Sequence, residues 1–376
     1  MLQRKNMKTN VTASSRLILT ASAAVLCALT VLPARLHASP PQYTVTDLGT
    51  LSGGNESYGS SINALGQVTG DGYTAGGADH AVRWTGTTPI DLGTLGGNSS
   101  QGLGINASGQ VAGYSYTTGN STAHAVRWTG TSATDLGTLG GQNSYAIGIN
   151  SSGNVVGHSQ TSGGSNNAFI YNGTNMVNLG TLANNGSYAN GINDSGLVVG
   201  SSPTASGFNH AVLYNGTSVI DLGTLGGNYS SATNVNASGW ISGGSYLSGD
   251  TIERVFLYNG ISMINIGTLP GDGDYQNYST GINDAGDVVG MAGADPFLYT
   301  GGTMYNINSL IAPGSITSVV RLSGYSTLND LGQIAAYGNI GGQQHALLLT
   351  PTPEPASTML LLGGGAFLAL RRRHRL

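Results

Sequence analysis

The chain has 376 residues, of which 61 are glycine, 39% are hydrophobic and only 8% are charged. So much glycine with so few charged helix formers argues against a mainly helical protein and favours short strands joined by tight turns. Residues 39–350 carry four arginines and no lysine against 16 acidic residues, a formal charge of −12 that argues against nucleic acid as a partner. The only cysteine is Cys27, so disulfides and thiolate metal sites are not expected downstream of it.

The first 38 residues are typical of a secretory signal peptide. They have a basic start, an apolar run from Leu17 to Leu32 and the segment Leu36-His37-Ala38 at the end, which is the order that export signals follow. The apolar run is about 16 residues long and stops before Pro33, so a retained anchor is the weaker interpretation. We predict that residues 1–38 are removed on export.

A short motif returns every 43 or 44 residues after this leader. Its full form is Asp-Leu-Gly-Thr-Leu-Gly-Gly, and full or shortened copies begin at Asp47, Asp91, Asp135, Asn178, Asp221 and Asn265. Such a period is typical of repeat architectures. Each period holds four strand-like segments, which in the second period are Gln101–Asn106, Gln110–Ser115, His124–Trp128 and Ala133–Leu139. Four antiparallel strands per period are typical of a β-propeller blade.

The turns between these segments have recognisable chemistry. Asn106-Ala107-Ser108-Gly109 predicts a type I turn followed by a left-handed glycine, and the pattern recurs in later periods. Two-residue hairpins are predicted at Thr85-Gly86, Thr129-Gly130, Asn172-Gly173, Asn215-Gly216 and Asn259-Gly260. Tight turns of both kinds make consecutive segments antiparallel neighbours.

The glycine of the second segment gives the number of repeats. It occurs at Gly70, Gly113, Gly157, Gly200, Gly243 and Gly290, with Ala336 in the seventh place. The seventh period lacks a fourth segment, because the chain leaves for Pro351, whereas Tyr43–Gly49 supplies an extra one at the start. We therefore predict an all-β, seven-bladed propeller over residues 39–350, closed by the N-terminal strand, with a β-solenoid as the alternative.

The period resembles the HAF repeats of bacterial extracellular proteins over nearly all of residues 43–350. The resemblance rests on the recurring motif, on Ile-Asn-x-x-Gly-x-Val-x-Gly and on third segments such as His80-Ala81-Val82. It implies a secreted or surface protein and supplies no activity. The last two periods depart from it through an insertion at Gly271–Tyr275 and a third segment that begins Asp295-Pro296.

Residues 351–376 contain a second targeting signal. Pro353-Glu354-Pro355 is followed by the apolar segment Ala356–Leu370 and by Arg371, Arg372 and Arg373. This order resembles the PEP-CTERM sorting signal of Gram-negative bacteria. The resemblance implies export across the inner membrane, recognition by an exosortase, cleavage near the motif, and delivery to the cell surface or biofilm matrix. A transmembrane helix is expected over the apolar segment before processing, with a permanent anchor as the alternative.

Residues that recur once per period are predicted to build the blades. They are His80, His124, His210 and His345, the acceptors Asp91, Asp135 and Asp221, and the aromatic residues Trp84, Trp128, Tyr171, Tyr214, Tyr258 and Tyr299. Tyrosines outside these positions are better candidates for ligand contacts, because a sugar face stacks on an exposed ring. They include Tyr114, Tyr116, Tyr145, Tyr188, Tyr229, Tyr246, Tyr275 and Tyr278.

No recognised catalytic constellation stands in the sequence, such as a nucleophile elbow, a His-Glu-x-x-His motif or a phosphate-binding loop. An enzyme would need ionisable residues that break the repeat and meet at the axis of the ring. Asp272 and Asp274 resemble a weak Ca²⁺ loop, but two carboxylates fall short of the six to eight oxygens that Ca²⁺ takes. We therefore expect no catalytic residue and no cofactor, with Ca²⁺ only a weak candidate.

The loops between second and third segments vary in composition, and a rigid ring that presents variable loops is typical of a binding scaffold. We predict a non-catalytic binding or structural protein of the cell surface or matrix, directed toward exopolysaccharide. The alternatives are a polysaccharide lyase or hydrolase on the same scaffold and a protein-binding adhesin.

Overall fold

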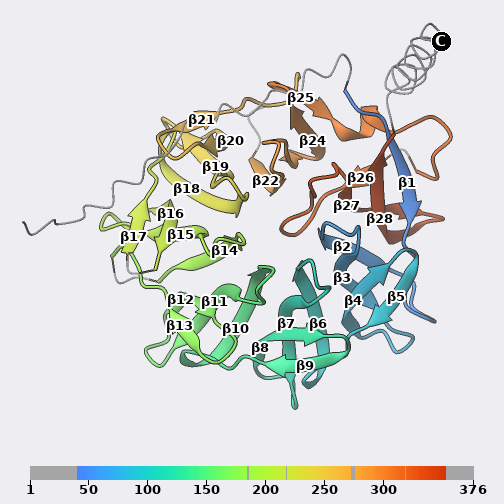
Figure 1. Cartoon of the computed structure of the whole chain (residues 1–376), viewed down its shortest axis with the longest axis horizontal. Coiled ribbons are helices and arrows are strands. Elements are labelled where there is room, and N and C mark those ends of the chain that lie inside the picture. Colours follow the sequence, from blue (N-terminus) through green and yellow to red (C-terminus); the bar gives the residue numbers. More distant parts are fainter. Residues whose placement is uncertain (1–39, 184–185, 217, 272–275, 318, 353–376) are drawn as a thin grey trace, which may run out of the picture. The chain divides into compact units, whose positions relative to one another are not determined.

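The computed structural model describes residues 40–352 except 184–185, 217, 272–275 and 318. The leader, the sorting signal and the Asp272–Asp274 loop therefore lie outside the described residues. Seven four-stranded antiparallel sheets surround one axis as the blades of a propeller (Figure 1). The predicted all-β, seven-bladed propeller is confirmed, and the solenoid alternative is wrong.

The first four blades follow one another along the chain, each running from an innermost strand at the axis to an outermost strand at the rim. Their strands are β2 (Ser57–Ile62), β3 (Val68–Tyr73), β4 (Asp79–Thr85) and β5 (Thr88–Asp91); β6 (Gly96–Ile105), β7 (Val111–Thr117), β8 (Ala123–Thr129) and β9 (Ser132–Asp135); β10 (Gly140–Ile149), β11 (Val155–Thr161), β12 (Asn166–Tyr171) and β13 (Met176–Asn178); and β14 (Tyr188–Ile192), β15 (Val198–Pro203), β16 (Asn209–Asn215) and β17 (Ser218–Asp221).

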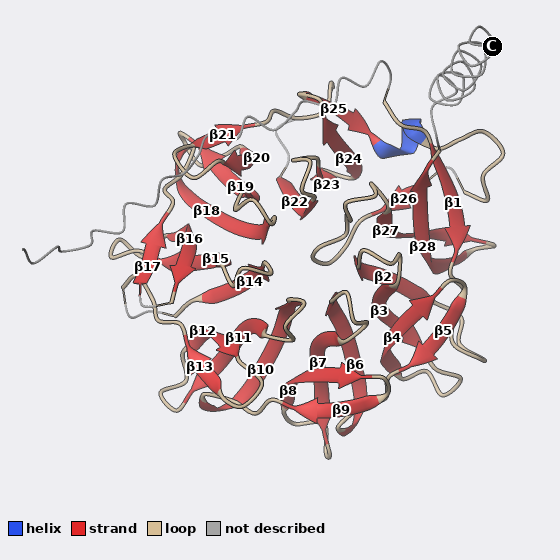
Figure 2. Ribbon diagram, in the orientation of Figure 1, coloured by secondary structure: helices blue, strands red, loops and turns tan. Residues whose placement is uncertain are grey.

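The last three blades include the one described helix, the short 3₁₀ helix η1 (Ile307–Leu310), which precedes blade 7 (Figure 2). Their strands are β18 (Gly226–Val235), β19 (Ile241–Leu247), β20 (Glu253–Tyr258) and β21 (Met263–Asn265); β22 (Asn277–Ile282), β23 (Val288–Ala292), β24 (Asp295–Thr300) and β25 (Thr303–Asn306); and β26 (Val320–Arg321), β27 (Ile334–Ile340), β28 (Gln343–Pro351) and β1 (Tyr43–Asp47).

The N-terminal strand closes the ring as predicted. β1 pairs antiparallel with β28, from Tyr43 opposite Pro351 to Asp47 opposite Leu347. The Tyr43 side chain is 1% exposed and belongs to the core between blades 6 and 7. The sheet of blade 7 therefore contains strands from both ends of the described chain, which closes the ring.

The hydrophobic core lies between blades, and in five of the seven blades the third strand carries an alanine on one face and large residues on the other. Ala81 of β4 packs against Val126 and Trp128 of β8, and all three are fully buried. Trp84, on the opposite face of β4, packs against Ala346 of blade 7. The expected role of the recurring aromatic residues in packing is confirmed for Trp84 and Trp128.

The second-strand glycine is explained by a β-bulge in the inner strand. In blade 2 the pairing of β6 with β7 shifts between Gly102 and Gly104, and a Cβ at Gly113 would lie 1.8 Å from the carbonyl oxygen of Gln101. The other five glycines meet the equivalent carbonyl at 1.8–2.1 Å. Blade 7 accepts Ala336 because its inner strand pairs only with Tyr337 and Gly338 there, leaving no carbonyl opposite.

Asparagines link the blades into a ring. The side-chain amide of Asn106 donates to the backbone carbonyl of Asn150 at 3.0 Å, while its side-chain oxygen accepts from the amide of Gln110 in its own turn. Equivalent bonds to the next blade are made by Asn63, Asn150, Asn193, Asn236 and Asn329. Gly109 has a φ of 74°, so the predicted turn with a left-handed glycine is confirmed.

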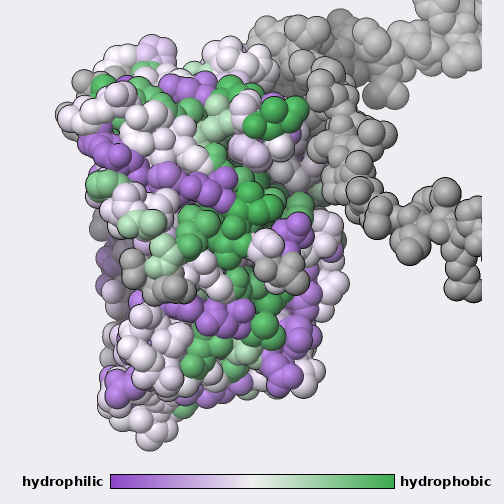
Figure 3. All heavy atoms as spheres, turned by 90° about the vertical axis from the view of Figure 1, so that its left-hand side faces the viewer, coloured by the Kyte–Doolittle hydropathy of each residue, from purple (hydrophilic) through white to green (hydrophobic). Residues whose placement is uncertain are grey.

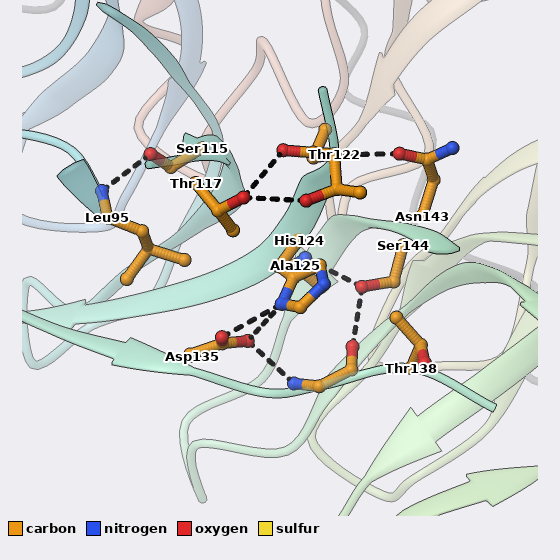
Figure 4. Close-up of polar contacts among 12 residues, drawn as sticks. Leu95, Ser115, Thr117, Thr122, His124, Ala125, Asp135, Thr138, Asn143 and Ser144 are labelled. Atoms are coloured by element: carbon orange, nitrogen blue, oxygen red, sulfur yellow. Dashed lines mark hydrogen bonds and ion pairs between the residues drawn. The ribbon is translucent and has the colours of Figure 1, made fainter. Parts of the chain in front are cut away.

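A second link uses serines that the sequence argument missed. The hydroxyl of Ser144 accepts from the amide of Ala125 at 2.8 Å and donates to the carbonyl of Gly137 at 2.6 Å, which ties β10 to the preceding blade (Figure 4). The same pair of bonds is made by Ser57, Ser100, Ser187 and Ser230. Their spacing of 43 or 44 residues is the signal that would have revealed them.

Two predicted hairpins are longer than expected. Thr85 pairs with Thr88, so the loop that contains Gly86 has the predicted two residues. In blades 3 and 5 the strands instead stop at Tyr171 and Tyr258, and four residues form each loop. The asparagine side chains there accept from loop amides, which favours the wider turn.

The rim is formed by short outer strands, whose length limits pairing with other chains. Figure 3 shows apolar side chains gathering on the rim at the side that carries β13, β17 and β21, whose exposed apolar residues are Val177, Ile220 and Ile264. Within the part of the chain that is described, no helix is long and apolar enough to cross a membrane. The expected transmembrane segment falls outside that part.

Candidate binding site at the mouth of the ring

The ring has two different faces. The lower face carries the asparagine turns between first and second strands. The chain also enters the ring at β1 and leaves it at β28 on this face. At that point the amide of Thr352 donates to the carbonyl of Gln42 at 2.7 Å. The upper face carries the loops between second and third strands and those between blades. As the sequence predicted, these two sets of upper loops share a face.

The recurring histidines and aspartates form pairs within blades. Nδ1 of His124 lies 2.8 Å from a carboxylate oxygen of Asp135, which also accepts from the amide of Gly137 (Figure 4). The same pairing joins His80 to Asp91 and His210 to Asp221, and His345 to Asp47 of the closing strand. These residues hold the outer strands and their turns, so the structural role predicted for them is confirmed.

Aromatic residues of first and second strands meet between neighbouring blades, and Tyr145 and Tyr188 occupy an inner-strand position that Tyr58 and Tyr278 also hold. Tyr114 of β7 packs edge-on against Tyr145 of β10 with ring centroids 5.0 Å apart, and Tyr145 stacks on His158 of β11 at 5.1 Å. His158 then contacts Tyr188 of β14 at 5.0 Å, and Tyr116 adjoins Tyr114. We call these five residues the aromatic arc; it runs unbroken from blade 2 to blade 4.

The arc is uncharged at neutral pH. Burial lowers the pKa of the His158 imidazole to about 4, so this ring stays neutral and behaves as one more flat aromatic surface. Burial and the nearby carboxylates of Asp79 and Asp71 raise the pKa of Tyr114 to about 12, so its phenol remains a hydrogen-bond donor. All five residues are half-buried.

Other blades extend the aromatic lining. Tyr229 of β18 contacts Phe208 and Tyr246 at centroid distances of 5.0 and 5.9 Å, and the phenol oxygen of Tyr246 accepts from Gln276. Most of the tyrosines that the sequence singled out therefore lie in two contiguous groups. Tyr275 lies outside the described residues.

Two carboxyl groups lie near each other beside the arc, and Asp71 departs from the repeat. Asp71 occupies the β3 position that Tyr114 and His158 hold in their blades, and Asp79 begins β4. Burial and the neighbouring carboxylate of Asp79 raise the pKa of Asp71 to about 8, so Asp71 keeps its proton at neutral pH. Gln101 donates to one carboxylate oxygen of Asp79 at 3.1 Å, and the other oxygen of Asp79 is buried without a hydrogen-bond partner among the described residues.

Asp79 also lines an open groove of about 680 Å³ on the upper face, between blades 1 and 2. Tyr73, Asn98 and Ser99 line the same groove, with the loop Gly76–Ala78 at its edge. This volume lies in the range of small-molecule sites, and the lining mixes one aromatic ring with amide, hydroxyl and carboxyl groups. The groove can take a polar ligand with an apolar face.

A loop blocks the axis below the arc. The inner strand of blade 7 leaves its sheet after Arg321, and residues 322–327 reach inward before Leu328 rejoins it. The backbone amide and hydroxyl of Ser326 contact the side-chain oxygen of Asn234 in blade 5 at 3.2 and 3.1 Å, and the amide of Tyr325 donates to Ser60 of blade 1. The loop therefore links blade 7 across the axis to blades 1 and 5, and we call the upper end of this axis the mouth.

Among the described residues, no three His, Asp or Glu side chains lie close enough together to hold a metal ion. The weak Ca²⁺ candidates Asp272 and Asp274 fall outside those residues, as do Pro353, Glu354, Pro355 and the arginines Arg371, Arg372 and Arg373. The sequence argument missed the Asp71–Asp79 pair, because their approach depends on the pairing of β3 with β4. Their departure from the repeat was the available signal.

Comparisons with known proteins identify the end of the chain. Residues 351–373 match the PEP-CTERM protein-sorting motif, which implies processing by an exosortase and a sorted cell-surface or secreted protein. No curated protein matches the chain significantly.

Solved structures share only the architecture. The chain is similar to TolB from Acinetobacter baumannii (13% identity, TM-score 0.45, covering 77% of this chain and 64% of that one). It is also similar to YCF48 bound to D1 peptide (10%, 0.46, 86% and 98%) and to a mutant Aleuria aurantia lectin in complex with Fucα1-6GlcNAc (14%, 0.35, 84% and 99%). At such identities and TM-scores these likenesses say nothing about function.

Proposed function

We propose that this sorted propeller is a non-catalytic carbohydrate-binding protein of the cell surface or biofilm matrix, and that its mouth binds exopolysaccharide. The observation that carries the proposal is the aromatic arc, five half-buried rings in contact across three blades. The resemblance of residues 43–350 to HAF repeats belongs to the same proposal, because the family match covers only the sorting motif.

The chemistry of the mouth fits a neutral sugar unit. Aromatic rings offer a flat surface for the apolar face of a pyranose, while Gln101, the protonated carboxyl group of Asp71 and the carboxylate of Asp79 supply donors and acceptors for hydroxyl groups. The carboxyl pair and the net charge of −12 over residues 39–350 oppose uronic acids and sulfated sugars. We therefore expect the preferred polymer to be neutral at its contact site.

Binding of neutral and acidic polysaccharides from the host matrix, measured by pull-down and calorimetry, tests the proposal. Tyr145→Ala should weaken binding roughly fivefold, since a lost aromatic contact costs about 1 kcal/mol. Tyr171→Ala is the matched control, because this half-buried tyrosine lies at the end of β12, where the chain turns toward the lower face. Absence of binding to every matrix polymer, or equal loss in both variants, would refute the proposal.

The proposal that an exosortase cleaves the C-terminal signal has its own test. The mass and the location of the native protein are measured in hosts with and without the exosortase. A form that ends near Pro355 in the matrix fraction supports sorting and cleavage. An intact C-terminus in the membrane fraction of both strains would instead make the tail a permanent anchor.

A polysaccharide-active enzyme is the second candidate, favoured by the convergence of Asp71 and Asp79. A hydrolase would use the two carboxyl groups about 5 to 9.5 Å apart on either side of the scissile bond, and a lyase would use one of them as a general base. Product release or loss of viscosity with matrix polymer, abolished by Asp71→Asn, would replace the binding proposal with an enzymatic one.

A further inference from the structure

Two leucines break the repeat on the lower face. The third residue of the asparagine turn is small in five blades, where it is Ser108, Ser152, Ser195, Ser238 and Ala285. In blades 1 and 7 the same position holds Leu65 and Leu331, whose side chains are 73% and 66% exposed. Turn chemistry does not account for them, because serine or alanine serves the same turn elsewhere.

The two leucines lie in neighbouring turns, since the side chain of Asn329 donates to the carbonyl of Asn63 at 3.0 Å. Leu331 lines a small cavity of about 80 Å³ with Pro41 and Pro351, which belong to the first and last described segments. Leu331 therefore lies beside the point where the chain leaves the ring, and Leu65 lies in the next turn around the lower face.

The sorting motif leaves almost no linker between the ring and the apolar tail. Thr352 is held by its bond to Gln42, and the apolar segment begins at Ala356. Four residue steps span at most about 14 Å. When the apolar segment lies in a bilayer, this part of the lower face must rest within that distance of it.

We propose that the lower face of the unprocessed protein docks on the membrane surface through Leu65 and Leu331. The mouth then points away from the membrane, because the groove beside Asp79 and the upper loops lie on the opposite face of the ring. Exposed leucines gain by entering the headgroup boundary. Asp284, Asp287 and Asp330 lie in the same or neighbouring turns, so the surface suited to this face is zwitterionic. The inference rests on the sorting part of the proposed function and not on sugar binding.

The cysteine content offers a direct test. The only native cysteine is Cys27 in the leader, so in a Cys27→Ala background single cysteines can be labelled with an environment-sensitive dye. The full chain carrying Leu65→Cys or Leu331→Cys is reconstituted with phosphatidylcholine vesicles. Ala205→Cys, in the exposed loop between β15 and β16 on the upper face, is the matched control.

Dye at positions 65 and 331 should shift to shorter wavelength and be quenched by lipid-attached quencher, whereas dye at position 205 should stay in water. Dye attached at Ser108→Cys should show the same kind of shift when both leucines are present. In the double variant Leu65→Ser, Leu331→Ser, dye at position 108 should lose most of that shift. Equal solvent exposure of dye at 65, 331 and 205, or failure of the full chain to float with vesicles, overturns the proposal. Glycan binding measured on the same double variant should be unchanged, which separates this result from a failure of the mouth.

Discussion

The second-strand glycine gives a sharp test of how the blades are built. A methyl group at Gly113 would lie 1.8 Å from the carbonyl oxygen of Gln101, while real Cβ atoms almost never approach closer than 3.0 Å. The two strands would have to separate by about 1.2 Å, a quarter of the normal strand spacing of about 4.8 Å. The bulged inner strand of blade 2 would lose its register with β7.

The cost of Gly113→Ala follows from two contributions. Overpacking a dense interior costs about 1 to 3 kcal/mol, and each backbone hydrogen bond lost between the strands adds about 1 kcal/mol. We expect a loss of about 3 kcal/mol or more, measured by urea denaturation with tryptophan fluorescence. Trp128, buried in the same blade, reports on the transition.

Blade 7 supplies the matched control. Ala336 stands in the equivalent place, fully buried, but its inner strand has left the sheet. Ala336→Gly therefore removes no clash and should cost only about 1 kcal/mol, from backbone entropy and one lost methyl group. The steric argument fails if Gly113→Ala unfolds within about 0.5 kcal/mol of the wild type, the ordinary range for a surface substitution, or if both variants lose the same amount.

Two further outcomes follow from the structure. Asn106→Ala should lower the free energy of unfolding, measured by urea denaturation, by about 1 to 2 kcal/mol more than Asn283→Ala does. The reason is that the side chain of Asn106 bonds to the next blade, whereas the side-chain amide of Asn283 donates to Asp287 of its own turn. Equal losses would argue against the inter-blade ring. Burial and Asp79 raise the pKa of Asp71 to about 8, against about 4 in the unfolded chain, so the folded state binds more protons and its stability should fall as the pH rises from about 4 through 8. Asp71→Asn should flatten that fall when unfolding is compared at pH 5 and pH 9, and an unchanged slope would contradict the raised pKa of Asp71.

The repeat made most of the fold predictable from sequence. Gly70 and its equivalents, the asparagine turns and the missing fourth segment each depend on contacts within a blade or on the count of blades. Closure by Tyr43–Asp47 followed because one strand was lacking at one end and in excess at the other. These features recur at a fixed spacing, so a single sequence contains several copies of the same observation.

The remainder depended on tertiary placement. The inner strand of blade 7 divides into β26 and the bridge at Leu328, and nothing local predicts that residues 322–327 reach Asn234 in another blade. The four-residue loops after Tyr171 and Tyr258 were missed because asparagine bonds to loop amides outweigh the usual preference of Asn-Gly. Short turns are decided by a few such bonds.

Departures from the repeat separate the working surfaces from the scaffold. Where most blades agree, as in the inter-blade bonds of six of the seven turn asparagines, one role is repeated for stability. Asp71 and Asp79 depart at the mouth, and Leu65 and Leu331 depart where the chain leaves the ring, on the opposite face. The propeller requires neither departure, since other blades fold with tyrosine, histidine or serine there. A rigid ring keeps the two faces apart, so substitutions at the mouth and at the exit should be independent, and a double variant that combines Tyr145→Ala with Leu65→Ser should show the sum of the two separate effects on glycan binding and membrane depth.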